Sequence, residues 1–238
     1  MPEERSADAL IADVEGTIGP VAFVREVLFP YARRSLPDYL RRHADEAPVA
    51  SLIEDAAAAA AVAPGDLDAV IEALLGWIDS DKKVTPLKAL QGMVWQHGYA
   101  AGDYRAPVYP DALAFMADCN ARGIAVYLYS SGSAAAQRLY CRYSTAGDIR
   151  AYVVDYFDTT SGGKLDAASY AGIAGAIGCD PARIVFASDH GPELIAAGKS
   201  GLQTLQLLRA DDVAITGEEP LPGHTVADSF EGISLSGD

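Results

Sequence analysis

A short apolar segment that ends in acidic residues constrains the fold of this chain more than any other feature. Residues 9–12 (ALIA) are all apolar, and they run directly into Asp13-Val14-Glu15-Gly16-Thr17. A short apolar run followed by a glycine-containing turn is typical of a buried strand. The sequence therefore predicts a strand whose carboxyl end carries two carboxylates, those of Asp13 and Glu15.

The rest of the chain divides into a helical block and an alternation of strands and helices. From about Ile18 to Arg105, apolar residues recur at helical spacing, for example in the stripe Leu67, Val70, Ile71, Leu74, Leu75 and Ile78. Beyond Pro107 the pattern predicts helices near 112–122, 134–143, 167–177 and 193–199, and strands near 124–129, 152–157, 184–187 and 204–208. Strands separated by helices favour a parallel sheet with helices on both faces.

The first strand can join this sheet only if the helical block is an insertion. We therefore predict an α/β fold, with a Rossmann-like parallel-sheet core formed by residues 1–18 and 106–238 and an inserted, all-helical domain formed by residues 19–105. Thr85 and Pro86 are predicted to be the N-cap and the first residue of a helix in the insertion. The tail from Asp211 is polar and rich in glycine and proline, so we expect a surface segment whose end frays.

The charge of the chain limits its partners. It has 33 Asp and Glu residues against 18 Lys and Arg residues, a formal net charge of −15. This charge would repel nucleic acid and the anionic face of a membrane, so we expect neither as a partner. It would also repel a small anionic substrate unless a metal ion or a lysine acts within the Debye length of about 8 Å. We expect a soluble, monomeric protein that acts on a small molecule.

The cysteines and the N-terminal residues favour a cytoplasmic protein. Cys119, Cys141 and Cys179 lack the paired spacing of a zinc site or a redox dithiol, and we expect reduced, buried thiols. Residues 1–9 lack the apolar stretch of a secretory signal, and the longest alanine run, Ala56 to Ala61, is too short to span a bilayer. A cytoplasmic location is therefore expected by elimination.

Candidate chemical groups gather where the predicted strands end, because ligands bind at the carboxyl ends of strands in an open parallel sheet. These groups are Asp13 and Glu15, Ser130 with Ser131, Gly132 and Ser133, Ser188 with Asp189, and Lys164 after a glycine-containing loop. Each has an ordinary alternative: the acids and serines could be helix caps or turn residues, and the lysine could lie on the surface. Their joint occurrence on one edge instead favours a site with a nucleophile, a second carboxylate, hydrogen-bond donors and a cation.

These residues reproduce, in order, the four signature motifs of the haloacid dehalogenase superfamily. Five segments closely resemble one of its families, the enolase-phosphatases of methionine salvage: residues 13–17 (DVEGT), 23–33 (FVREVLFPYAR), 83–92 (KVTPLKALQG), 129–133 (YSSGS) and 156–170 (YFDTTSGGKLDAASY). Glu15 is the most specific residue, because most phosphatases of the superfamily have Asp at that position. The resemblance extends from about Leu10 to Arg209.

The resemblance implies a core of the haloacid dehalogenase type with a helical cap, and a Mg²⁺-dependent phosphatase. It implies that Asp13 becomes a transient aspartyl phosphate and that Glu15 acts first as general acid and then as general base. It further implies that Mg²⁺ is held by Asp13, the main-chain carbonyl of Glu15, and Asp189. The implied phosphate-binding residues are Ser130, Ser131, Gly132 and Lys164. A side chain at position 132 would keep the backbone from closing on the phosphate.

Several roles stay open at this level. Glu15 is a candidate base for enolisation, but it could equally have only the ordinary acid–base role, with Mg²⁺ or Lys164 stabilising an enediolate. Glu193 could orient Lys164 or the metal waters. His190 could act as a base or ligand, or only bond its own loop. Three aromatic or amide residues could line the pocket or form the core of the cap, namely Gln91, Trp95 and Tyr99.

Three functions are compatible with these residues. The first is a bifunctional enolase-phosphatase that converts 2,3-diketo-5-methylthiopentyl 1-phosphate to the enol phosphate and then to acireductone and phosphate. The second is a phosphatase for another small ester, because the phosphoryl machinery does not fix the leaving group. The third, a non-catalytic phosphate-binding protein, would not need both Asp13 and Glu15, and a dehalogenase would not need metal-binding acids. The similarity of segments 23–33 and 83–92 to the enolase-phosphatases favours the first function.

Overall fold

The chain forms two compact units. The computed structural model describes residues 3–63, 65–82 and 84–237. One unit contains the residues up to Phe23 together with those from Arg105 onwards, and the other contains Val24–Tyr104. The first strand and the later strands thus belong to one unit, and the helical block is an insertion between them. The predicted fold class, an α/β core with an inserted all-helical part, is confirmed.

The α/β unit is built on a parallel sheet. Within the described residues, six strands form this sheet in the order β4-β3-β2-β5-β6-β7. They are β2 (Ala9–Ala12), β3 (Ala125–Tyr129), β4 (Asp155–Phe157), β5 (Ile184–Ser188), β6 (Gln203–Leu207) and β7 (Thr225–Ala227). Ala12 of β2 pairs in parallel with Leu128 of β3 and with Ala187 of β5. The residues that follow these three strands therefore leave the sheet at the same edge.

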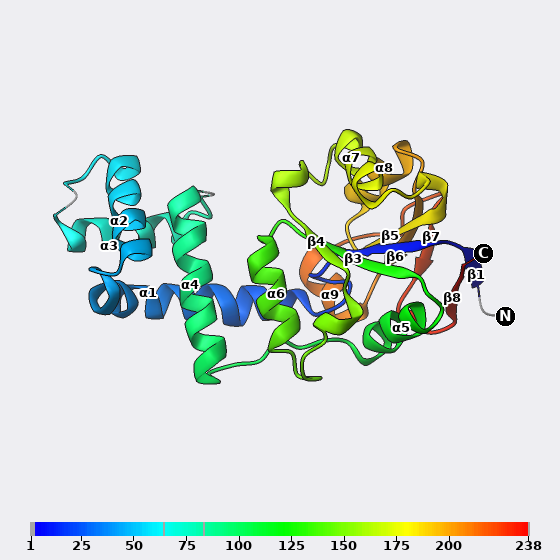
Figure 1. Cartoon of the computed structure of the whole chain (residues 1–238), viewed down its shortest axis with the longest axis horizontal. Coiled ribbons are helices and arrows are strands. Elements are labelled where there is room, and N and C mark those ends of the chain that lie inside the picture. Colours follow the sequence, from blue (N-terminus) through cyan, green and yellow to red (C-terminus); the bar gives the residue numbers. More distant parts are fainter. Residues whose placement is uncertain (1–2, 64, 83, 238) are drawn as a thin grey trace. The chain divides into compact units, whose positions relative to one another are not determined.

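Helices cover both faces of the sheet. The helices of this unit are α5 (Pro110–Ala121), α6 (Ala134–Arg142), α7 (Ala167–Ile177), α8 (Gly191–Lys199) and α9 (Ala210–Thr216), with 3₁₀ turns at Arg150–Tyr152, Thr159–Ser161 and Pro181–Arg183. Helices α7 and α8 lie on one face of the sheet and α5 on the other (Figure 1). Every residue of β2 and β5 is buried, as expected for central strands covered on both sides.

The core beneath α7 and α8 is tightly filled. Ile11, Tyr129 and Phe186 project from the sheet into a cluster that also contains Ile173 of α7 and Leu194 of α8. The ring of Tyr170 makes T-shaped contacts with those of Tyr129 and Phe186, at centroid distances of 5.5 and 5.0 Å. This packing fixes the loops that leave the carboxyl edge of the sheet.

The inserted unit is helical in the residues that the structure describes. Its elements are a π-helix at Phe23–Leu28, whose first residue belongs to the α/β unit, and the helices α1 (Phe29–His43), α2 (Ala47–Ala60), α3 (Leu67–Asp79) and α4 (Thr85–Ala101). The stripe predicted from Leu67 to Ile78 faces the core of this unit, where Val70, Ile71 and Leu74 are buried against Leu87, Leu90 and Val94 of α4. The apolar periodicity of the sequence therefore identified the buried faces correctly.

The predicted N-cap of α4 is wrong. Helix α4 begins at Thr85, its N-cap is Val84, and no side chain caps it. The amide of Lys88 donates to the carbonyl of Val84 at 3.0 Å, which places Thr85 inside the first turn. Proline is tolerated at position 86, the second residue of the helix, because a backbone N–H there would have no partner within the helix. Residue 83, the first of the cap segment 83–92, lies outside the described residues.

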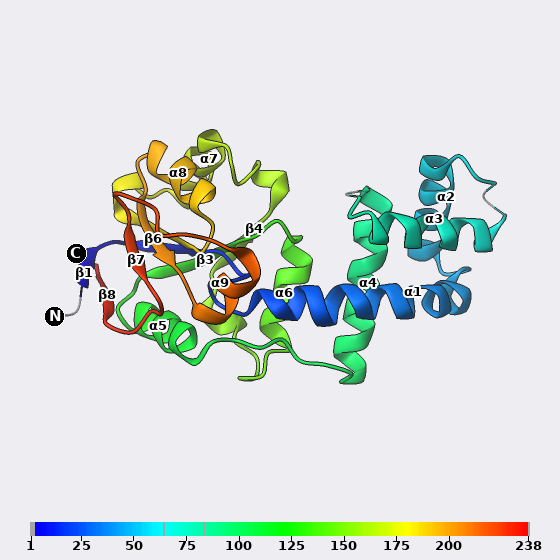
Figure 2. The same cartoon turned by 180° about the vertical axis from the view of Figure 1, so that it is seen from behind.

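Most residues of the C-terminal tail are exposed or half-buried, as expected for a surface segment, but the tail is more regularly structured than its composition suggested. The tail forms α9, then β7 at the edge of the main sheet, and then β8 (Ile233–Ser236), which pairs in parallel with β1 (Glu3–Ser6). Figure 2 shows this return of the chain beside its N-terminal strand. Asp212 is buried and accepts hydrogen bonds from the amide of Val21 at 2.9 Å and the hydroxyl of Tyr109 at 2.6 Å. Long-range contacts of this kind, which local composition does not encode, order the tail.

Two further expectations concern the cysteines and the membrane. Cys119, Cys141 and Cys179 are free thiols; the first two are buried and the third is half-buried. Burial raises the pKa of both Cys119 and Cys141 to about 12, so these thiols are poor nucleophiles. Among the helices of the described residues, none is long and apolar enough to cross a membrane.

The tail should contribute measurably to stability. The ring of Phe230 stacks on that of Phe115 at 4.6 Å and is 3% exposed. We expect Phe230→Ala to lower the free energy of unfolding by about 3 kcal/mol, because it leaves a cavity. Val226→Ala in the same tail is the control, since Val226 is 39% exposed and should cost less than about 1 kcal/mol. Urea unfolding followed by near-ultraviolet circular dichroism measures both, and equal effects would contradict a packed tail.

Candidate active site

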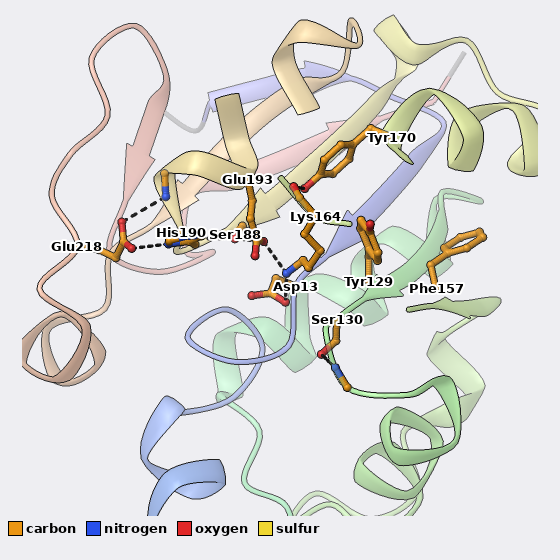
Figure 3. Close-up of polar contacts among 12 residues, drawn as sticks. Asp13, Tyr129, Ser130, Phe157, Lys164, Tyr170, Ser188, His190, Glu193 and Glu218 are labelled. Carbon is orange, nitrogen blue, oxygen red and sulfur yellow. Dashed lines mark hydrogen bonds and ion pairs between the residues drawn. The ribbon is translucent and has the colours of Figure 1, made fainter. Parts of the chain in front are cut away.

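The carboxyl edge of the sheet carries a buried ion-pair cluster. The Nζ atom of Lys164 lies 2.6 Å from Oδ1 of Asp13 and 2.5 Å from Oε2 of Glu193 (Figure 3). All three residues are less than a tenth exposed. Asp13 follows β2, Lys164 follows the turn at Thr159–Ser161, and Glu193 lies in the first turn of α8. The sheet thus brings together groups that are 151 and 29 residues apart in the chain.

The charge of Lys164 is stabilised by its neighbours. Burial acts to lower the pKa of this ammonium group, but the carboxylates of Asp13 and Glu193 outweigh burial and raise it above its ordinary value. Lys164 is therefore protonated at neutral pH. For Glu193, burial and repulsion from Asp13 raise the pKa in spite of the lysine. One cation between two buried carboxylates leaves excess negative charge in the cluster.

Asp189 adds a third carboxylate to the same edge. It follows β5 and is buried. Burial, together with repulsion from Asp13 and Glu193, raises the pKa of Asp189 to about 8. A carboxylic acid in such surroundings is stabilised as a carboxylate only if a further cation comes close.

Gly16 makes room for Asp189. A Cβ atom at position 16 would lie 2.4 Å from Oδ2 of Asp189, and Gly16 has a φ of +74°. Both the space and the left-handed backbone conformation therefore require glycine. The turn is closed by the amide of Gly16, which donates to the carbonyl of Gly19 at 2.8 Å. Glu15 lies in this turn, half-buried, two residues after Asp13. The sequence suggested a glycine turn here but not its contact with Asp189.

The loop after β3 is held by Ser130 and by Gln137, a residue that the sequence analysis did not single out. Ser130 is buried, and its Oγ accepts from the amide of Gly132 at 3.0 Å. The amide group of Gln137 donates to the carbonyls of Gly132 and Phe157 at 3.0 and 2.8 Å. Ser131 is exposed. A Cβ atom at position 132 would make only ordinary contact, 3.5 Å from Oγ of Ser130, so protein atoms alone do not require this glycine.

Two tyrosine hydroxyls fix the segment that carries Lys164. Tyr129, the last residue of β3, donates to the carbonyl of Gly162 at 2.9 Å, and Tyr170 of α7 donates to the carbonyl of Lys164 itself at 2.8 Å. Gly162 has a φ of +120°, and a Cβ atom there would overlap Ser169. Both tyrosines lie in segments that resemble the enolase-phosphatases, 129–133 and 156–170. Their hydrogen bonds could not be inferred from the spacing of residues in the sequence.

His190 and Glu193 have different surroundings. Oε2 of Glu193 accepts from the hydroxyl of Ser188 at 3.1 Å in addition to its contact with Lys164. His190 instead pairs through Nδ1 with Oε1 of Glu218 at 2.5 Å. Glu193 therefore faces the buried cluster, whereas His190 faces the C-terminal part of the chain.

The oxygen atoms at this edge fit Mg²⁺ better than a metal such as zinc. In the part of the chain that the structure describes, no three His, Cys, Asp or Glu side chains are placed to hold a metal together. Mg²⁺ does not need them, because it is usually bound by one or two carboxylates, with waters and substrate phosphate completing the shell. The carboxylates of Asp13 and Asp189 and the carbonyl of Glu15 could supply such a set. The excess negative charge around Lys164 also favours a divalent cation.

The comparisons with known proteins agree with this geometry. Residues 7–201 match the model of the haloacid dehalogenase-like hydrolases. The enolase-phosphatase E1 of Azotobacter vinelandii is 51% identical over 225 residues, which cover 94% of this chain and 96% of that protein. Those of Pseudomonas aeruginosa (strain LESB58) and Thioalkalivibrio sulfidiphilus are 48% and 45% identical, and each comparison covers at least 94% of both chains.

Solved structures show the same fold. The crystal structure of the UTR4 protein of Saccharomyces cerevisiae has a TM-score of 0.81 and 32% identity, covering 95% of this chain and 99% of that one. CbbY of Rhodobacter sphaeroides, solved with phosphate, has a TM-score of 0.58 at 18% identity and covers 94% of this chain and 95% of its own. At that identity the likeness to CbbY concerns the fold alone.

The parallel sheet, the helical insertion and the polar cluster at the carboxyl edge define a haloacid dehalogenase-like hydrolase, and the chain belongs to that family. The chain is thus an enzyme of the hydrolase class. Within the family it belongs to the enolase-phosphatases E1, as the identity of 45–51% over nearly the whole chain shows. The resemblance inferred from the sequence motifs is confirmed.

The contact between Gly16 and Asp189 can be tested with a matched pair of variants. Gly178 has a φ of +73° and open space around it, so Gly178→Ala should cost about 1 kcal/mol of stability from backbone strain alone. Gly16→Ala has the same strain and in addition displaces Asp189. We expect it to lower phosphate release at least tenfold, while Gly178→Ala retains activity. Equal activity of the two variants in a phosphate-release assay would show that the position of Asp189 is unimportant.

Proposed function

We propose that this chain is the Mg²⁺-dependent enolase-phosphatase of methionine salvage. It converts 2,3-diketo-5-methylthiopentyl 1-phosphate to the enol phosphate and then to acireductone and phosphate. The observation that carries the phosphatase half is the buried contact of 2.6 Å between Asp13 and Lys164 at the carboxyl edge of the sheet. It combines a carboxylate nucleophile with a cation that suits a phosphate. The enolase-phosphatases that resemble the whole chain support the substrate.

Asp13 is the nucleophile in this proposal. A carboxylate oxygen of Asp13 attacks phosphorus, the bond between phosphorus and the ester oxygen breaks, and Glu15 protonates the departing oxygen. Water then attacks the phosphorus of the aspartyl phosphate, Glu15 accepts its proton, and the release of phosphate regenerates Asp13. Lys164 holds Oδ1 of Asp13 in a fixed orientation before the reaction begins.

The remaining residues bind and neutralise the phosphate. Phosphoryl transfer depends mainly on positioning and charge stabilisation. The proposed donors to the phosphate oxygens are the hydroxyl of Ser130, the amides of Ser131 and Gly132, and the ammonium group of Lys164. Glu193 positions Lys164 through their contact of 2.5 Å.

The proposed metal site consists of Asp13, the carbonyl of Glu15, and Asp189. When bound there, Mg²⁺ would reduce the repulsion between the acidic cluster and an anionic substrate. Asp13 and Asp189 are buried, which restricts the movement of their side chains.

The remaining proposals concern the role of the helical insertion, the partners of the protein and its location. We assign the helical insertion, residues 19–105 in the sequence-based division, as the cap that selects the substrate. The substrate is a small phosphate ester. The net charge of −15 supports the absence of nucleic acid and membrane partners. We propose a monomer that acts in the cytoplasm.

Replacement of the nucleophile is the first test. Asp13→Asn should abolish phosphate release from the diketo substrate, because an amide is a far weaker nucleophile than a carboxylate. Enol absorbance and free phosphate are followed together, with and without EDTA. Asp8→Asn, at the other end of β2, is the control, since it removes only a surface ion pair with Arg183.

Three outcomes of this assay bear on the proposal. Retained turnover by Asp13→Asn would refute the nucleophile, and phosphate release in EDTA would refute the metal. Hydrolysis of an aryl phosphate with no action on the diketo substrate would leave the phosphatase mechanism in place and favour the alternative of another small phosphate ester.

The cation can be tested separately. Lys164→Met keeps roughly the length of the side chain but removes its charge. We expect kcat/KM to fall about 100-fold and the inhibition constant of inorganic phosphate to rise, because phosphate binds less tightly. Lys199→Met, at an exposed lysine in the last turn of α8, should leave both constants unchanged. Unaltered kinetics of Lys164→Met would remove Lys164 from the site.

A further inference from the structure

The turn that carries Asp189 leads directly into a helix with an unusual N-terminus. Helix α8 begins at Gly191, two residues after Asp189, and its N-cap residue His190 makes no side-chain capping bond. The second residue of the helix is Pro192, which has no N–H. The amide of Glu193 donates to the carbonyl of His190 at 3.1 Å. The amide of Gly191 therefore needs an acceptor from another part of the chain.

Glu218 supplies that acceptor. Its Oε2 accepts from the amide of Gly191 at 3.2 Å, and its Oε1 lies 2.5 Å from Nδ1 of His190 (Figure 3). A carboxylate can only accept, so Nδ1 of His190 carries the proton. An anion at a helix N-terminus is also favoured by the helix dipole. One side chain, 27 residues further along the chain than Gly191, thus holds both residues that follow Asp189.

Gln206 forms a second tie to the same segment. This residue of β6 is fully buried. Its Nε2 donates to the carbonyl of Asp189 at 3.2 Å and to that of Glu219 at 3.0 Å, and its Oε1 accepts from the amide of Leu221 at 2.7 Å. Leu221 packs on the core under α7 and α8. The main chain of Asp189 is therefore linked through Gln206 to Glu219 and Leu221. Together with Glu218, these residues belong to what we term the 218–221 segment.

We propose that the 218–221 segment is a clamp that positions Asp189 for the metal ion, and that Glu218 is its positioning residue. The proposal rests on the assignment of Asp189 as a metal ligand under the proposed function. Asp189 lies near the carboxylates of Asp13 and Glu193, which repel it in the ionised form that binds a metal. Bonds that do not involve the metal must therefore hold the turn in place. Preorganised ligands bind a metal more tightly than ligands that must first be ordered.

The clamp predicts a loss of metal affinity without a loss of the catalytic groups. Glu218→Gln removes the negative charge at the N-terminus of α8 and leaves a single acceptor oxygen, so the contact with His190 is either lost or kept only by a change of the histidine tautomer. We expect the dissociation constant for Mn²⁺, an oxygen-preferring substitute for Mg²⁺, to rise about tenfold, the lower end of the range for outer-shell changes. Saturating Mg²⁺ should restore kcat, with the substrate KM unchanged.

The experiment compares four proteins freed of metal: the wild type, Glu218→Gln, Glu219→Gln and Asp189→Asn. Binding of Mn²⁺ is followed by the electron paramagnetic resonance signal of the free ion, and kcat is measured as a function of Mg²⁺. Glu219→Gln is the matched control, because it removes the same charge from the adjacent, exposed side chain. It should bind Mn²⁺ as the wild type does, whereas Asp189→Asn should lose binding.

Each other outcome has one meaning. Wild-type affinity in Glu218→Gln, together with loss of binding in Asp189→Asn, overturns the clamp and leaves the proposed function intact. Equal weakening by Glu218→Gln and Glu219→Gln also overturns the clamp, since net charge would then be the cause. Wild-type binding by Asp189→Asn removes the metal ligand of the proposed function, and the clamp with it. A kcat of Glu218→Gln that Mg²⁺ does not restore contradicts a positioning role.

Discussion

The dominant constraint on the site is the group of carboxylates that is buried at the carboxyl edge of the sheet. Asp13, Asp189 and Glu193 are three carboxylates with one ammonium group, Lys164, among them. Removing charges from water costs several kcal/mol each unless partners compensate. A protein that served only to be stable would gain nothing from such a cluster. The structure is consistent with a site in which a divalent cation and a phosphate group complete the charge balance.

Parallel strands make this cluster possible, and long-range bonds keep it in place. The pairing of β2 with β3 and β5 brings the ends of three distant segments to one edge. The sheet does not orient the side chains, however. Hydrogen bonds from Tyr129 and Tyr170 fix the main chain at Gly162 and Lys164, and a hydrogen bond from Gln137 fixes the loop after β3. Gly16 has no side chain and so leaves space for Asp189.

The sequence predicted the fold and the candidate residues because both follow local rules. Apolar runs mark strands, and the residues after Ala12, Tyr129 and Ser188 must lie together once the strands are parallel. The interactions that hold these residues were not predictable, because they join distant positions. The prediction of Thr85 as the N-cap was wrong because the first residue of a helix is set by its backbone hydrogen bonds, and these make Val84 the N-cap. The helix and strands of the tail were not predicted, because its polar composition gave no sign of buried contacts such as those of Asp212.

The order of the tail and the geometry of the site have a common cause. A polar segment rich in glycine and proline cannot bury enough apolar surface to offset the entropy of ordering it. Residues 218–221 are ordered instead by hydrogen bonds to the turn around Asp189, through Glu218 and Gln206. The same bonds restrict that turn, so each side stabilises the other. A change that loosens the tail therefore acts on Asp189, although no residue of the tail needs to touch the substrate.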